Sequence, residues 1–326
     1  MTAVSGAGTG RSSVSGRSPL LTLVLLAAMV AAGCGAGPGQ EAGNVELLVT
    51  RDYGEQELLR LPEPEQSGGD TVMRLLQRNA EVETRYGGGF VQAIDGLAGG
   101  QENGRSVDWF FYVNGIEAEE GAASREVEDG AKVWWDRRDW GAAQRVPAVV
   151  GAFPEPFRTG EKGRRFPVRI ECSDLESDAC NQVYERFTEL GIVAARGGLG
   201  TSGGDETIRV VVGPWSDVRD RDTVARSLSE GPRVNGIFAR MRDGGRTLVT
   251  LDDRGREVQR LGAGTGLIAA GRDGEFPPTW LVTGTDDAGV ESAIAALDES
   301  ALEAKYALAI SEDRGVPLPE REGRAP

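Results

Sequence analysis

The sequence has 326 residues, enough for two domains with hydrophobic cores, and it carries a net charge of −15 at pH 7 without a single histidine. The acidic balance argues against nucleic-acid binding, which needs clustered Lys and Arg, and against electrostatic docking on anionic lipid. The missing histidine excludes Ser-His-Asp and Cys-His catalysis and zinc sites with histidine ligands.

Residues 1–33 have the composition of a secretory signal peptide. Arg11 and Arg17 precede an apolar run at residues 20–32, which is too short to span ~30 Å of hydrocarbon comfortably as a helix. The sequence Ala-Ala-Gly-Cys at residues 31–34 resembles the bacterial lipobox, although that family usually has Leu at the position of Ala31. The resemblance implies a lipid on Cys34 that anchors the protein at the extracytoplasmic face of the cell membrane. An ordinary signal peptide cleaved nearby is the alternative, and the glycine-rich residues 34–44 form the expected tether.

Two further cysteines, Cys172 and Cys180, remain if Cys34 is acylated. An even pair in an oxidising compartment predicts a disulfide that closes a short loop. A redox or metal site would need a closer CxxC spacing and further ligands, which this segment lacks.

The first domain is expected at residues 45–140, from alternating apolar patterns and turn signals. Asn114 and Gly115 follow an aromatic strand and predict a type I′ hairpin turn, because both residues tolerate a positive φ. The pattern predicts strands at residues 45–50, 58–61, 90–94, 107–113 and 131–137, and a helix at residues 70–78.

Four motifs in this domain resemble the transcobalamin-like C-terminal domain: TVMRLL at residues 71–76, WFFYVNG at 109–115, GA at 121–122 and VEDGAKVWW at 127–135. The resemblance implies a small α+β, β-grasp-like domain that binds a ligand. In transcobalamins the domain closes over a corrinoid beside a large helical domain. No such helical domain is predicted here, so a corrinoid is a less favoured ligand.

Aromatic residues on the predicted strands are the candidate ligand-binding residues. Strand alternation places Trp109 and Tyr112 on opposite faces, and likewise Trp134 and Trp135. An aromatic surface could therefore face a ligand, and its predicted members are Trp109, Tyr112, Trp134, Trp135 and Trp140. The alternative is that all five side chains pack into cores.

Pro and Gly punctuate residues 141–165, a predicted linker, and a second domain follows at residues 166–311. Apolar strands alternate there with helices predicted at 178–190, 216–228 and 286–297, which indicates an α/β domain with a mixed sheet. The polar residues 312–326 are expected to form a flexible tail.

These observations predict an α+β, β-grasp-like domain followed by an α/β domain, in a lipid-anchored binding or adaptor protein without catalytic activity, cofactor or metal. Its ligand would be a small molecule, a glycan or a partner protein of the envelope. The alternative function is a carboxylate-based hydrolase of cell-envelope glycans, with Asp286 and Asp287 as candidate acids. Both acids stand where a strand meets a helix, so an N-cap role is the simpler interpretation.

Overall fold

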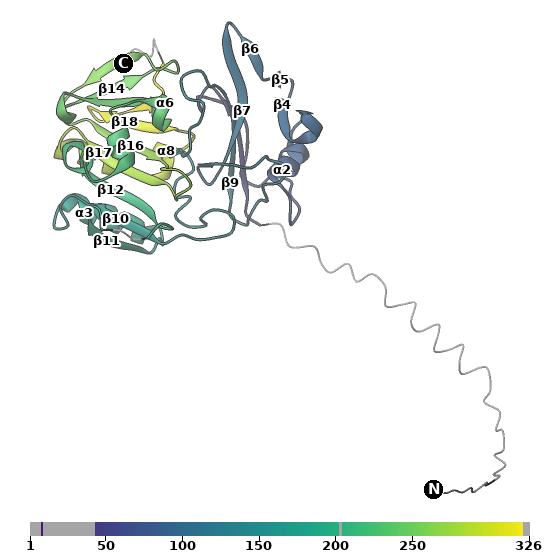
Figure 1. The fold of residues 1–326 in the computed structure, drawn as a ribbon, viewed down its shortest axis with the longest axis horizontal. Helices are drawn as coiled ribbons and strands as arrows, with labels where there is room; N and C mark the ends of the chain where they lie inside the picture. The colour runs from purple at the N-terminus through teal and green to yellow at the C-terminus, as the bar shows by residue number, and fades with distance from the viewer. Residues whose placement is uncertain (1–7, 9–42, 202–203, 322–326) are drawn as a thin grey trace, which may run out of the picture. The chain divides into compact units, whose positions relative to one another are not determined.

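The computed structural model describes residues 8, 43–201 and 204–321 (Figure 1). The described residues from Gly43 onward belong to one compact unit. The predicted signal peptide, Cys34 and nearly all of the predicted tether lie outside the described residues. Among the helices in the described ranges, none is long and apolar enough to cross a membrane.

The first sheet has a parallel pair at its centre. Its order is β2-β1-β9-β7-β6, and β8 also pairs with β7. β1 and β9 are parallel, whereas β1 pairs with β2 and β9 pairs with β7 in the antiparallel sense. The strands are β1 (Glu46–Arg51), β2 (Gln56–Leu61), β6 (Gly100–Glu102), β7 (Arg105–Val113), β8 (Ile116–Glu117) and β9 (Lys132–Asp139). This arrangement confirms the predicted α+β domain.

The turn predicted between β7 and β8 is confirmed, because Asn114 and Gly115 have φ values of 55° and 76°. The helix α2 (Val72–Asn79) is capped by Thr71, whose side chain accepts a hydrogen bond from the Arg74 N–H at 3.3 Å. Its buried face packs with residues of β1, β7 and β9 into one core. Figure 1 shows the helix on one side of the sheet that contains β7 and β9. A small antiparallel sheet contains β3 (Val82–Arg85), β4 (Phe90–Ile94) and β5 (Leu97–Ala98), and the 3₁₀ turn η1 (Tyr86–Gly88) joins β3 to β4.

The second sheet has seven strands in the order β11-β10-β12-β17-β16-β18-β19, and it confirms the predicted mixed α/β sheet. β11, β10, β12 and β17 are parallel, while β16 runs antiparallel between β17 and β18. The strands are β10 (Val168–Cys172), β11 (Ala194–Gly198), β12 (Ile208–Pro214), β16 (Gly266–Gly271), β17 (Thr279–Gly284), β18 (Ala307–Ser311) and β19 (Arg314–Leu318). A three-stranded sheet contains β13 (Ala239–Arg242), β14 (Thr247–Leu251) and β15 (Glu257–Leu261).

The second predicted domain is called the second part below. Its helices are α3 (Asp178–Glu189), α4 (Trp215–Val218), α5 (Thr223–Ser227), α6 (Pro232–Asn235), α7 (Asp287–Ala295) and α8 (Glu299–Leu302), and η2 (Asp243–Gly245) is a 3₁₀ turn. The single helix predicted at residues 216–228 is wrong, because α4 ends at Val218 and α5 begins anew. Asp222 adopts an extended conformation between them and accepts a hydrogen bond from the Ala225 N–H, which makes it an N-cap.

Two segments that were expected to be loose are packed. In the predicted linker, Phe153 and Phe157 are buried against Phe187 and Trp280 of the second part. The predicted flexible tail contains β19, which pairs with β18. The predicted linker is packed because its apolar side chains are buried. The predicted tail forms a strand because it pairs with the otherwise free edge of β18.

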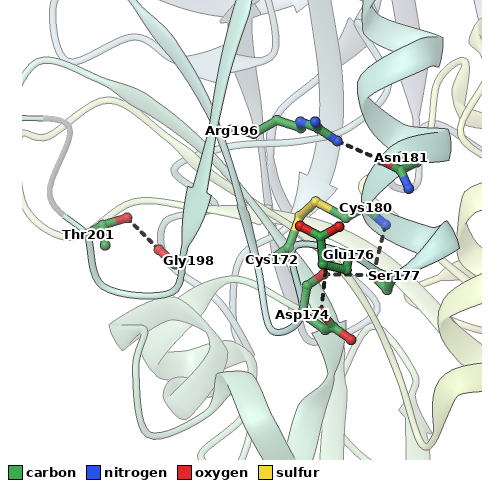
Figure 2. Close-up of a disulfide and its surroundings, with 9 residues drawn as sticks. All are labelled: Cys172, Asp174, Glu176, Ser177, Cys180, Asn181, Arg196, Gly198 and Thr201. Atoms are coloured by element: carbon green, nitrogen blue, oxygen red, sulfur yellow. Dashed lines mark hydrogen bonds between the residues drawn. A yellow bond between two sulfur atoms is a disulfide. The ribbon is translucent and has the colours of Figure 1, made fainter.

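The disulfide between Cys172 and Cys180 is confirmed, with 5.8 Å between the two Cα atoms. Figure 2 shows that it joins the end of β10 to the first turn of α3. Ser177 caps the same helix by accepting a hydrogen bond from the Cys180 N–H at 3.2 Å. The covalent bond and the cap therefore fix the start of α3 together.

Candidate ligand-binding groove

The predicted aromatic surface is not an exposed surface in this structure. Trp109, Tyr112, Trp134 and Trp135 are each at most 5% exposed, and Trp140 is partly buried. Trp109 and Trp135 face the core beneath α2, whereas Tyr112 and Trp134 pack with residues of the second part. The strand alternation was therefore correct, but both faces of the sheet are covered.

Tyr306 of the second part is the centre of the contact between the two predicted domains. Its ring lies against Tyr53, Tyr112 and Trp134, with centroid distances of 5.0–5.6 Å. Its hydroxyl donates a hydrogen bond of 2.9 Å to the fully buried carboxylate of Asp136. Two of the five predicted ligand-binding residues thus hold the two halves of the unit together.

Asp136 and Arg138 place two buried charges at this contact. Burial raises the pKa of Asp136, although hydrogen bonds from Thr50, the Gly54 N–H and Tyr306 oppose that rise. Arg138 donates to the backbone oxygens of Ala143 and Gln144 and lies 3.6 Å from a carboxylate oxygen of Glu117. These contacts stabilise the charges in place, and they indicate a structural network.

An aromatic groove of about 570 Å³ lies beside this network. Its aromatic walls are Phe90 of β4 and Trp109, Phe110 and Phe111 of β7, and its polar walls are Glu117, Glu119, Gln144, Arg145 and Glu275. Phe90, Phe110 and Phe111 are each only partly buried. Concave sites with aromatic walls and a few polar groups are the usual form of a ligand pocket.

The pairing of β7 explains why aromatic side chains from both of its faces reach this groove. On one edge, β6 pairs with residues 105–107, and β8 pairs with Tyr112 and Val113. Residues 108–110, by contrast, pair with β9 alone. This gap in the sheet edge lets the rings of Phe110 and Phe111 border one hollow from opposite faces.

The ring of Phe110 is held in place by a buried arginine. The guanidinium of Arg138 stacks on it, with 3.7 Å between the Arg138 Cζ and the ring centroid. Arg138 is fully buried, so its stacking limits the movement of the Phe110 ring. Phe111 is held in a similar way by Trp135, at a centroid distance of 4.8 Å. Rings fixed in this way lose little conformational freedom when a ligand stacks on them.

Acidic groups dominate the polar rim of the groove. Glu117 is paired with Arg145 at 3.1 Å, and Glu119 lies 3.8 Å from Arg272. Glu275 is exposed. The rim therefore offers several carboxylate acceptors beside flat apolar rings. Sequence reasoning identified Trp109 but missed the other groove residues, because a gap in strand pairing has no signature in a single sequence.

The two candidate acids of the alternative hydrolase, Asp286 and Asp287, both lie at the start of α7. Asp286 caps α7 by accepting a hydrogen bond from the Gly289 N–H at 2.9 Å, and it also accepts one from the Gly264 N–H at 3.0 Å. The glycine-rich segment at residues 262–266 is thereby tied to α7. Asp287 is exposed in the first turn of α7, where acids suit the helix dipole.

The described residues contain no group of three or more His, Cys, Asp or Glu side chains that could hold a metal ion. Burial raises the pKa values of Tyr53, Tyr112 and Tyr306 well above the ordinary tyrosine value. These phenols are therefore protonated near neutral pH. Tyr306 donates a hydrogen bond to Asp136 and Tyr53 donates one to the backbone oxygen of Asp139, whereas Tyr112 contributes packing.

Comparison with known protein families gives a match over part of the chain. A family described as a domain of unknown function (DUF4430), which is transcobalamin-like, matches residues 69–138. The match runs from α2 to β9 and includes all four aromatic residues of the groove. No protein with a curated description matches the sequence. The matched segment is consistent with a binding role for the first part of the chain.

Proposed function

We propose that the protein is an extracytoplasmic binding protein, anchored to the membrane by a lipid on Cys34, and that its aromatic groove binds a glycan. The lipobox-like residues 31–34 support the anchor. The groove itself supports the binding role, because its fixed rings form a concave site with an acidic rim, and these rings lie within a segment that resembles a ligand-binding family.

The chemistry of the groove favours a glycan over the other candidate ligands. The faces of Phe90 and Phe110 offer flat apolar surfaces for the C–H faces of sugar rings, and carboxylates such as Glu119 accept hydrogen bonds from hydroxyl groups. A partner protein that adds a strand would need a longer free edge than residues 108–110 of β7. The proposed role needs no catalysis, which agrees with the lack of histidine and the capping role of Asp286.

Oligosaccharides released from the cell envelope by enzymatic digestion test this proposal. Saturation-transfer NMR should show contact between one of them and the wild-type protein, and Phe90→Ala should weaken the measured affinity about tenfold, since one stacked ring is worth about 1–1.5 kcal/mol. The control is Tyr184→Ala, which removes a partly exposed aromatic side chain from α3, outside the groove. Equal affinity in all three proteins, or no contact with any envelope oligosaccharide, would contradict the proposal.

A further inference from the structure

A second cavity, separate from the aromatic groove, has a volume of about 490 Å³. It lies where the turn between β1 and β2 meets β15, β19 and the residues after β19. Its apolar walls include Tyr53, Leu261, Pro317 and Pro319. The turn packs closely against the residues before β18, because a Cβ atom at Gly54 would overlap the backbone oxygen of Ala304.

Glu320 brings a carboxylate into the wall of this cavity, although its side chain is largely withdrawn from water. The residue is 6% exposed, and its two carboxylate oxygens accept hydrogen bonds from Thr250 Oγ1 and Gln259 Nε2. Both donors are neutral. Within residues 43–201 and 204–321, no Lys or Arg nitrogen forms an ion pair with Glu320.

The other carboxylates that line the cavity each have a cationic partner. Arg321 lies 3.1 Å from Asp52 and is also paired with Glu55. Glu312, on the rim, is 84% exposed and lies 3.7 Å from Arg314. Among the described residues that line the cavity, Glu320 is therefore the carboxylate that has no ion pair with a cation of the chain.

We propose that this cavity binds a small organic cation, an ammonium group on an apolar body, and that Glu320 is its counter-ion. A buried carboxylate is costly without a cationic partner, and each of its oxygens can accept more than the one hydrogen bond it now receives. The apolar walls suit the body of such a ligand. This site does not depend on the glycan-binding role of the groove.

Phenethylamine is a suitable probe, with phenethyl alcohol as its uncharged counterpart of nearly the same shape. Calorimetric titration of the intact protein should give an affinity at least tenfold higher for the amine than for the alcohol. Glu320→Gln should reduce amine affinity at least tenfold, whereas the control Glu189→Gln, which removes an exposed carboxylate on α3 outside the cavity, should change it less than twofold. Phe90→Ala should leave it unchanged, which separates this site from the groove.

NMR with the wild-type protein locates the amine without relying on any variant. The backbone amide signals of Gln259 and Gly315, which both line the cavity, should shift on addition of phenethylamine. Absence of amine binding, equal binding of amine and alcohol, shifts confined to other residues, or undiminished binding by folded Glu320→Gln would each overturn the proposal.

Discussion

Asp252 lies in the turn between β14 and β15, and its carboxylate collects hydrogen bonds from the Arg254 N–H, the Arg256 N–H and the Arg256 guanidinium. Burial alone would raise the pKa of Asp252, but these hydrogen bonds outweigh it and hold the pKa below its ordinary value. A lowered pKa in the folded state means that the ionised carboxylate stabilises the fold at neutral pH.

Asp252→Asn should therefore lower the free energy of unfolding by about 1–2 kcal/mol at pH 7. The contribution is fully present above the unfolded pKa of about 4 and is lost as the pH falls through the lower folded value. Urea unfolding of both proteins between pH 7 and pH 2.5 checks this expectation. A difference that is constant across this range would show that Asp252 does not act through its charge.

At the scale of elements, the sequence predicted four strands of the first sheet, the mixed α/β character of the second sheet and the disulfide, because apolar alternation and turn residues are local signals. β11 and β19 were missed, since both are edge strands whose partner is only visible in three dimensions. The groove was missed for a related reason. Trp109 was found from its strand, but Phe90 belongs to another sheet, and Glu275 lies far along the chain.

The disulfide is the covalent element that holds the start of α3 at the end of β10. Replacing Cys172 and Cys180 together by Ala should lower the free energy of unfolding by roughly 2–3 kcal/mol, because the open chain has more conformations when unfolded. Both cysteines are buried, so dithiothreitol should reduce the native protein slowly. Unfolding in urea, with and without prior reduction in denaturant, measures the contribution. Unchanged stability of the double variant would contradict this role.

At the scale of the whole molecule, the two predicted domains behave as parts of one compact unit. Tyr306 contacts Tyr53, Tyr112 and Trp134 and bonds to Asp136, so one side chain of the second part completes a network of the first. Tyr112 and Trp134, two of the predicted ligand-binding residues, are used for this contact. The rings left for binding are Phe110 and Phe111, at the gap in the edge of β7, and Phe90 of β4.

Tyr306→Phe removes only the hydroxyl that bonds to buried Asp136, so it should cost about 1–3 kcal/mol of unfolding free energy. Tyr184→Phe is the matched control, since Tyr184 is partly exposed on α3. Thermal and urea unfolding should show a single transition for both variants, shifted only for Tyr306→Phe. Equal stability of the two variants would mean that this hydrogen bond does not hold the halves together.

Native mass spectrometry of the protein, gently extracted from the membranes of cells that make it, tests the central proposal most directly. The account predicts that the mature chain begins at Cys34 and is heavier than its sequence mass by the mass of a lipid anchor. It also predicts a retained ligand of carbohydrate mass, which the Phe90→Ala variant loses. A chain without lipid at Cys34, or one that carries only a protein partner and keeps it in the Phe90→Ala variant, would contradict the account of an anchored glycan-binding protein.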